Sequence, residues 1–151
     1  MFNVEDCVAL LTNQGSKSLC ESMNSHFMEG ITRVQWTALY YIKTHHNVTQ
    51  RALSQLMMIS EPSATHLIER LLNAGFIVRE NALDDHRAKI LKLTKAGDKI
   101  YEDTYASVEA FNKAATTGIS DEELHTFKSV MKKMLENVNT EAGSVKNDEK
   151  K

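Results

Sequence analysis

Short hydroxyl and imidazole side chains gather on one side of a predicted helix over residues 60–74. Ser63, Thr65 and His66 lie in its N-terminal half, where they can form hydrogen bonds with a polar surface. The opposite side is apolar with the i, i+3, i+4, i+7, i+8 spacing of an amphipathic helix: Ala64, Leu67, Ile68, Leu71 and Leu72. Short donors and acceptors on an exposed helix suit the DNA major groove, where base edges must be approached closely. Taken alone, the same face is typical of an ordinary surface helix.

The ends of this helix carry residues with known terminal preferences. Ser60 suits the N-cap, Pro62 sits in the first turn, and Gly75 stops the helix. Thr49 suits the N-cap of a preceding helix, whose buried residues are Ala52, Leu53, Leu56 and Met57. Only about three residues separate the two helices, so they must meet at a steep angle, as in a helix-turn-helix.

A β-hairpin is predicted directly after the second helix. Residues 76–80 and 88–93 are runs of β-branched and aliphatic residues separated by a polar stretch. Near its tip, Arg87 is planar and always charged, which suits a narrow, electronegative minor groove, and Asp85 can orient it. An isolated Asp-x-Arg is more often a solvated ion pair contributing under about 1 kcal/mol. Here the tripeptide Asp85-His86-Arg87 follows a helix-turn-helix at the distance that a wing needs.

This order of motifs resembles the MarR (multiple-antibiotic-resistance-type) family of bacterial transcription regulators. The resemblance covers roughly residues 5–138 and rests on L-x-x-x-G, D-x-R and L-T-x-x-G in that order. Upstream, the sequence from Ile31-Thr32 through Gln35 and Trp36 to Leu39 is similar to the start of the family's second helix. The matching residues of the winged-helix region are Thr49, Leu53, Leu56, Ser60, Thr65, Leu67, Arg70, Leu71, Ala74, Gly75, Phe76, Arg79, Asp85, Arg87, Leu93, Thr94 and Gly97.

The resemblance implies a homodimer that binds a palindromic operator in double-stranded DNA, most simply as a repressor. The second helix of the helix-turn-helix would enter the major groove, and the wing arginine the minor groove. The implied DNA-binding residues are Thr49, Gln50, Ser60, Ser63, Thr65, His66, Arg70, Asp85, His86 and Arg87. Positions 66 and 86 are often basic in the family but are histidines here, which predicts weaker or pH-dependent phosphate contacts at neutral pH.

The predicted fold class is mainly α with a small β-hairpin wing. It is a winged helix-turn-helix with N- and C-terminal dimerisation helices. A single domain is expected over residues 1–138, with the winged helix-turn-helix lobe at 32–94 and dimerisation helices at 4–29 and 95–138. Residues 139–151 lack periodicity and are predicted to be a disordered tail.

The flanking helices carry more apolar residues than the core of one small lobe can bury. A helix of about 24 residues after residue 95 would be roughly 36 Å long. That length exceeds the diameter of a compact domain built from half of this chain. Ser120-x-x-Glu123 is a capping box that opens the last helix. We expect these helices to pack against a second subunit, which would place two recognition helices about one DNA turn apart. The alternative is a monomeric helical cap. The stripes are Val4, Val8, Leu11, Gly15, Leu19, Met23 and Phe27; Ala96, Ile100, Thr104, Val108, Phe111 and Ala115; and Leu124, Phe127, Met131, Met134, Leu135 and Val138.

The composition predicts a soluble protein with a single hydrophobic core. The 151 residues are 42% hydrophobic and 25% charged, with no window near the roughly 18 apolar residues of a membrane span. No signal peptide precedes the first helix, so a cytoplasmic protein is expected. The net charge of −2 divides into +3 over residues 43–95 (eight Lys or Arg, five acids) and −5 elsewhere (ten and fifteen). The basic segment, residues 43–95, coincides with the winged helix, although a net charge of +3 produces only a weak electrostatic field.

Catalytic and metal-binding motifs are absent from the sequence. It contains no Gly-rich phosphate loop, G-x-S-x-G, H-E-x-x-H or C-x-x-C, so neither an enzyme nor a cofactor is expected. His45 and His46 are adjacent, but neighbours on a helix point about 100° apart and make poor co-ligands. No metal site is therefore predicted.

The regulatory input is left open by the sequence. Some MarR relatives sense oxidants through an N-terminal cysteine, and the redox candidates here are Cys7 and Cys20. Cys7, near the start of the first helix, would be reactive if the helix N-terminus lowers its pKa, although most cytoplasmic cysteines are inert. Other relatives bind aromatic acids or drugs beside the dimer helices. The corresponding ligand-binding candidates, which equally suit a plain core, are His26, Phe27, Trp36 and Tyr40.

The sequence also fits a different class of function. A winged-helix module can bind a protein partner instead of DNA, and the acidic total and the two histidines favour this alternative.

Overall fold

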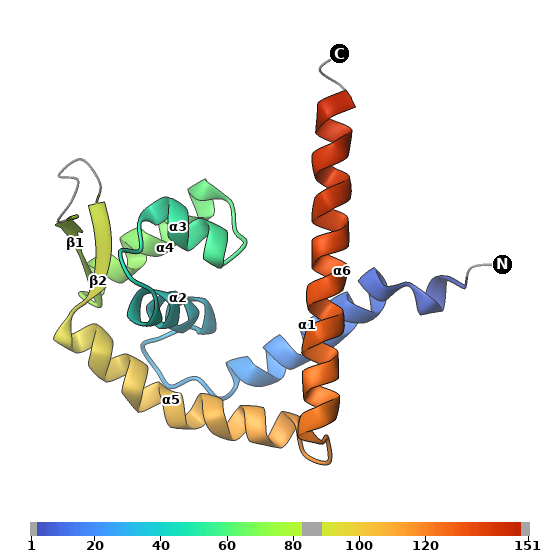
Figure 1. Ribbon diagram of the computed structural model, residues 1–151. Helices are drawn as coiled ribbons and strands as arrows, with labels where there is room; N and C mark the ends of the chain where they lie inside the picture. The colour runs from blue at the N-terminus through green and yellow to red at the C-terminus, as the bar shows by residue number, and fades with distance from the viewer. Residues whose placement is uncertain (1–2, 83–88, 149–151) are drawn as a thin grey trace. The chain divides into compact units, whose positions relative to one another are not determined.

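The computed structural model describes residues 3–82 and 89–148 (Figure 1). It divides into two compact units, Met1–Ala115 and Thr116–Lys151. The second unit contains α6 (Asp121–Asp148). The first contains η1 (Val4–Asp6), α1 (Val8–Asn24), α2 (Arg33–Thr44), α3 (Gln50–Leu56), α4 (Glu61–Asn73), β1 (Ile77–Asn81), β2 (Lys89–Leu93) and α5 (Lys95–Ala115). The predicted fold class, mainly α with a small hairpin, is confirmed.

Side-chain caps begin the helices of the lobe where the sequence predicted them. Thr32 and Gln35 form a reciprocal capping box at α2, with N···O distances of 3.3 and 2.9 Å. The Thr49 hydroxyl accepts from the Ala52 N–H at 3.1 Å and caps α3. Ser60 caps α4. Because each cap satisfies a backbone N–H that has no partner inside its helix, the start of each helix is fixed by local sequence.

The turn between α3 and α4 is tight and contains a strained residue. Met58 has φ 53°, a left-handed conformation that costs a residue with a Cβ roughly 1–2 kcal/mol. Its side chain is 75% exposed and contributes little packing. This turn joins α3 to α4 through residues 57–60 alone.

Met58→Gly is expected to raise the free energy of unfolding by about 0.5–1 kcal/mol. Glycine removes the left-handed strain, while the greater freedom of its unfolded chain offsets part of the gain. Urea unfolding measures the change. As a control, Gln55→Gly in the exposed face of α3 should cost about 1 kcal/mol, because its backbone is helical. A loss of stability in both variants would contradict the strain argument.

The hairpin is antiparallel and is joined to the start of α3. Its register pairs Ile77 with Leu93 and Asn81 with Lys89. Thr49 forms an isolated bridge with Ile90, and the Leu91 N–H donates to the Val48 carbonyl at 2.8 Å. The segment before α3 therefore acts as a short third strand, which fixes the base of the wing to the helix-turn-helix.

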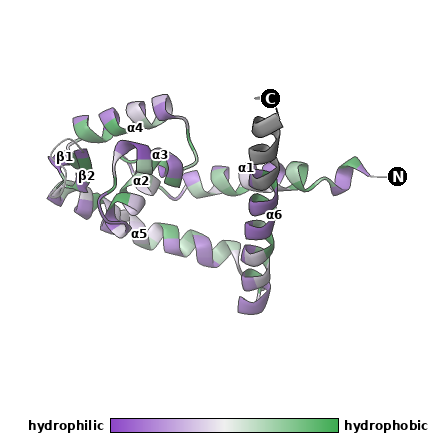
Figure 2. Ribbon diagram, turned by 45° about the horizontal axis from the view of Figure 1, so that its top comes forward, coloured by the Kyte–Doolittle hydropathy of each residue, from purple (hydrophilic) through white to green (hydrophobic). Residues whose placement is uncertain are grey.

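Helix α2 lies at the centre of the core of the first unit. Figure 2 shows hydrophobic and hydrophilic residues alternating along α4 and α5, which face this core with their apolar sides. The predicted stripe of α4 is buried at Ala64, Leu67, Ile68 and Leu71. The other core residues include Ile31, Trp36, Leu39, Ile42, Val48, Leu53, Ile77, Leu91 and Tyr101.

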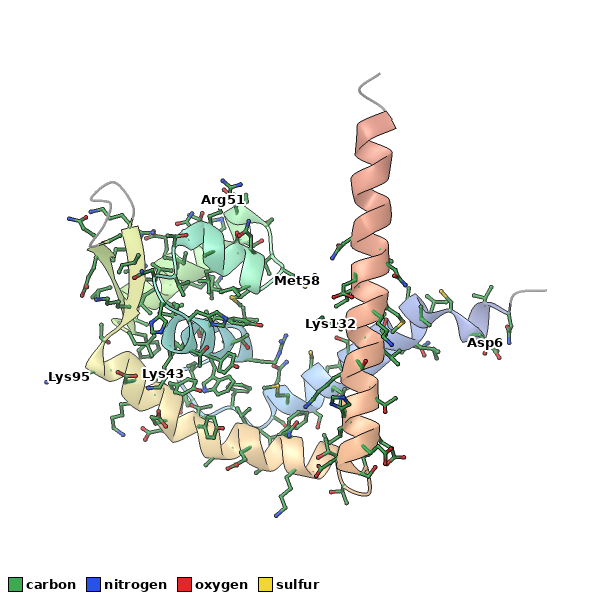
Figure 3. All side chains as sticks on the ribbon, in the orientation of Figure 1. Asp6, Lys43, Arg51, Met58, Lys95 and Lys132 are labelled. Carbon is green, nitrogen blue, oxygen red and sulfur yellow. The ribbon has the colours of Figure 1, made fainter. Side chains whose placement is uncertain are left out.

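The seam between α2 and α5 combines aromatic stacking with an ion pair. The Trp36 and Tyr101 rings stack with centroids 5.2 Å apart, and the Trp36 indole N–H donates to the Tyr101 carbonyl at 3.2 Å. Lys43, labelled in Figure 3, lies 2.7 Å from an Asp98 carboxylate oxygen and 3.2 Å from one of Glu102. The hydrogen bond with Asp98 raises the pKa of the Lys43 ammonium. These carboxylates are half exposed, so the ion pairs contribute under about 1 kcal/mol each and the aromatic stack dominates.

The L-T-x-x-G motif forms the junction between the hairpin and α5. The Thr94 N–H donates to the Phe76 carbonyl at 3.0 Å, and its hydroxyl donates to the Gly75 carbonyl at 2.6 Å. The same hydroxyl accepts from the Gly97 N–H at 3.0 Å and so caps α5. Gly75 itself, at φ 70°, ends α4 as the sequence predicted. Thr94 thus connects the end of α4, the hairpin and the start of α5.

Helix α6 opens at the predicted capping box and runs further than predicted. The Glu123 carboxylate accepts from the Ser120 N–H at 2.8 Å and from its hydroxyl at 2.9 Å, which lowers the pKa of Glu123. The helix continues to Asp148, so residues 139–148, predicted to be disordered, are helical in the structure. A helix that has started adds one hydrogen bond for each further residue, and no proline interrupts this stretch. Across the described residues, no helix is both long and apolar enough to span a membrane.

Candidate nucleic-acid interface

Helix α4 presents a polar face at its N-terminal half. Its apolar side is buried in the lobe, so Ser63 and His66 on the other side are exposed, as predicted. Thr65 is half-buried. The face carries hydroxyl, imidazole and carboxylate groups, which suits hydrogen bonding to base edges better than attraction to phosphates.

The first turn of α4 holds two hydroxyl groups together. The Ser60 and Ser63 oxygens lie 2.8 Å apart, while Ser60 also accepts from the Ser63 N–H at 3.3 Å. The hydroxyl oxygen of Ser60 is therefore used as the N-cap acceptor of α4, and that of Thr49 is used in the same way at α3. Ser63, which is exposed, is the member of the pair that can turn its hydroxyl outward.

Two contacts connect α4 to its neighbours through its polar side. The Gln50 amide at the start of α3 donates to the Thr65 hydroxyl at 2.9 Å. Arg79 of β1 contacts the Glu69 carboxylate at 2.8 Å. Both Arg79 and Glu69 are well exposed, so this ion pair sets geometry more than it adds stability. Arg70, another predicted contact, is exposed in the last turn of α4.

The predicted wing residues Asp85, His86 and Arg87 lie outside the described residues. The structure does describe both strands of the hairpin. There Lys92 contacts Glu80 at 2.7 Å, and the Lys89 ammonium donates to the Asn81 side-chain oxygen. Both lysines lie on β2, the strand whose Ile90 bridges to Thr49.

Comparison with known proteins identifies this arrangement. A family model described as MarR family matches residues 29–88. An HTH-type transcriptional regulator of Staphylococcus aureus is 32% identical over 104 residues, which cover 68% of this chain and 71% of that protein. The chain belongs to the MarR family. It is therefore a winged-helix, DNA-binding transcription regulator, and this family is a class of regulators and not of enzymes.

Solved structures of MarR-type regulators share the fold. The S. aureus MepR-DNA complex has a TM-score of 0.80 at 22% identity and covers 90% of this chain and 99% of its own. CouR from Rhodococcus jostii RHA1, bound to p-coumaroyl-CoA, has a TM-score of 0.80 at 19% identity and covers 89% and 95%. At these identities the likeness shows the fold alone.

Three of the four predicted effector residues of this MarR-family chain lie together. The Trp36 ring centroid is 6.1 Å from that of Phe27 and 6.3 Å from that of Tyr40. His26 instead packs edge-on against Phe111, with centroids 5.4 Å apart, and its Nδ1 lies 2.9 Å from the Ser22 carbonyl oxygen. Trp36 is a core residue, whereas Tyr40 is 39% exposed. The cluster therefore joins the core to the surface.

An open pocket of about 370 Å³ adjoins this cluster between the end of α1 and the start of α2. Phe27 is the only predicted effector residue that lines it, together with Asn24, Ile31, Thr32, Arg33 and Val34. Within the described residues, the Arg33 Nε is a buried nitrogen without a hydrogen-bond partner. Sequence reasoning missed Arg33, because nothing in its local pattern distinguishes it from a solvated first-turn residue.

The two cysteines are unpaired and half-buried. Cys7 is the N-cap residue of α1 but makes no side-chain capping bond, and Cys20 lies 4.0 Å from the Ser16 hydroxyl. Within the part of the chain that the structure describes, no group of three or more potential metal ligands occurs.

Arg51 is a further candidate that sequence reasoning did not single out. It is exposed at the start of α3, next to Gln50, and Figure 3 shows its side chain directed away from the lobe. The first helix of a helix-turn-helix crosses the DNA backbone, so a basic residue there is placed for a phosphate contact. Its only sequence indication is its position two residues after the N-cap Thr49.

Proposed function

We propose that this MarR-family chain is a homodimeric repressor that binds a palindromic operator in the cytoplasm. A small phenolic or aromatic ligand, or an oxidant, releases it from the DNA. The observation that carries the proposal is the polar N-terminal half of α4, which is exposed while the opposite side of the same helix is buried. Such a helix can enter the major groove without disturbing the core.

Exposed apolar side chains support the homodimer. No residue of α1 is buried, and Val8, Leu11 and Leu19 are each more than half exposed. In the second unit, Phe127 and Val138 of α6 are 62% and 56% exposed. Burying such side chains is favourable by roughly 25 cal/mol for each Å² removed from water. A second copy of the chain, which a palindrome requires, would cover them.

The aromatic cluster supports a ligand effector. Phe27, Trp36 and Tyr40 provide stacking surfaces beside a pocket, and the buried Arg33 Nε offers a donor to an acidic or phenolic oxygen. A ligand bound there would contact both the end of α1 and the start of α2. Its binding can therefore change the position of the winged-helix lobe relative to α1. The oxidant alternative rests on Cys7 at the start of α1.

Gel-shift with the DNA upstream of the protein's own gene tests the proposal. A retarded complex that contains two chains for each site, and that is lost on adding salicylate or hydrogen peroxide, would support it. Salicylate represents the aromatic ligand class, and peroxide acting on wild type but not on Cys7→Ser would identify the oxidant route. Failure to bind any upstream DNA would favour the alternative of a protein-binding winged-helix module, which the net charge of −2 supports.

Arg87→Ala is expected to weaken operator binding by about 5- to 150-fold, which corresponds to about 1–3 kcal/mol for a groove contact. The folded dimer should remain, because a wing arginine adds little to the core. Fluorescence anisotropy with labelled operator measures the affinity, and Lys99→Ala on α5 is the control for loss of a positive charge. An affinity that falls equally in both variants would remove Arg87 from the interface.

A further inference from the structure

We propose that the Glu69–Arg79 ion pair is an autoinhibitory contact, in which Glu69 withholds Arg79 from the phosphates of the operator and so lowers the affinity for DNA. Arg79 is the phosphate-binding residue of this pair, and Glu69 is a positioning residue that acts through it. The inference rests on the proposed operator contact of α4 and adds to it the residue that limits the strength of that contact.

Glu69 lies on the side of α4 that is proposed to face DNA. It is exposed and follows His66 by three positions, which places both side chains on one side of the helix, opposite the buried Ala64 and Leu71. A carboxylate in this place repels phosphates unless a cation compensates its charge. The compensating cation comes from the neighbouring strand, because the Arg79 Nη2 donates to the Glu69 Oε1 at 2.8 Å.

Arg79 reaches α4 from β1. Side chains alternate between the two faces of a strand, so Arg79 points to the same face as Ile77, which is buried in the core, while Glu80 points to the opposite face. A helix in the major groove has a sugar-phosphate backbone on either side of it, and at least half of protein–DNA hydrogen bonds go to phosphates and sugars. An arginine that ends beside the exposed side of α4 is therefore placed for a phosphate at the rim of the groove.

Both partners of the ion pair remain accessible. The exposed fraction is 37% for the Arg79 side chain and 49% for that of Glu69. The bond to Glu69 uses one of the five guanidinium N–H donors, so the charge of the carboxylate, and not a lack of donors, opposes a phosphate contact. To bind a phosphate, Arg79 must either leave Glu69 or hold two anions side by side. Glu69 therefore offsets the attraction that Arg79 would otherwise add.

Glu69→Gln should strengthen operator binding. Glutamine keeps the shape of the side chain and removes its charge, so Arg79 becomes free to contact a phosphate. The affinity should rise about 2- to 5-fold, the range that the small free energy of an exposed ion pair allows. The slope of log affinity against log salt concentration should steepen by about 0.9, the value for one further phosphate contact. Glu69→Ala frees Arg79 by a different substitution and should give the same steeper slope.

Arg79→Ala and the double variant Glu69→Gln, Arg79→Ala complete the test. Arg79→Ala should bind more weakly than wild type, since it leaves the Glu69 charge facing DNA. The double variant, which has neither charge, should have the affinity and the salt slope of wild type. A double variant as tight as Glu69→Gln would show that Glu69 acts by repulsion alone. A double variant with a shallower slope than wild type would show that Arg79 already binds a phosphate. Either result overturns the inference.

Fluorescence anisotropy with the full-length chain and labelled operator, at several KCl concentrations, gives the affinity and the slope, and urea unfolding checks that each variant is folded. Glu80→Gln is the matched control, because it also frees a cation of the hairpin, Lys92, but on the opposite face from Arg79. It should change both quantities less than Glu69→Gln does. Equal changes would show only a general effect of net charge and overturn the inference. A wild-type chain that binds no operator would instead overturn the proposed operator binding, and this inference with it.

Discussion

Gly97→Ala is expected to lower the free energy of unfolding by about 2–3 kcal/mol, the cost of forcing extra atoms into a packed site. A Cβ built on Gly97 would lie 1.9 Å from the Phe76 carbonyl oxygen and 2.9 Å from its carbon. Both are backbone atoms, and the Thr94 N–H donates to the same carbonyl, so neither can move without breaking the junction of hairpin and α5. Operator affinity should fall as well, because this junction positions the wing.

Urea unfolding and operator affinity measure the two effects. Gly15→Ala is the matched control: Gly15 lies within α1, and a Cβ built on it meets no atom of the chain within 4 Å. Alanine is the better helix former by roughly 0.5–1 kcal/mol, so the control should be neutral or slightly stabilising. A Gly97→Ala protein as stable as the control would show that the close approach is not rigid.

The features that sequence alone predicted are those fixed by residues close together in the chain. Thr32, Thr49, Ser60 and Ser120 each cap a helix through a bond to a residue three positions later. The apolar stripe of α4 is similarly local, because its period alone decides which side is buried. Helix starts and the buried side of α4 were therefore predictable.

Contacts between residues far apart in the sequence were not predictable, because the residue type at one position does not show which distant residue it contacts. Gln50 meets Thr65 fifteen positions later, and the Trp36 indole meets the Tyr101 carbonyl after sixty-five. The family motif placed Thr94 and Gly97, but only the packing shows that Gly97 is needed for the approach of Phe76. The candidate interface was thus predicted as a set of residues, whereas the pairing of Glu69 with Arg79 required the structure.

Deleting residues 120–151 is expected to abolish the proposed homodimer, whereas deleting residues 139–151 should leave it intact. The apolar stripe that the sequence predicts ends at Val138, which is 56% exposed, so the shorter deletion removes helix but none of the predicted stripe. Operator affinity should fall about 10²- to 10⁴-fold in the longer deletion, because a palindrome bound by two linked lobes gains that factor over a single lobe. Sedimentation equilibrium gives the mass of each protein, and anisotropy gives its affinity.

A single substitution separates loss of the interface from loss of folding. Phe127→Glu places a charge where α6 exposes its largest apolar side chain, and it should yield a monomer with an intact lobe. Lys128→Glu changes the neighbouring position to the same residue and should remain dimeric, because Lys128 lies outside the apolar stripe. If Phe127→Glu sediments as a dimer with wild-type affinity, α6 does not form the interface and the proposed dimer must form through the other flanking helices, α1 and α5.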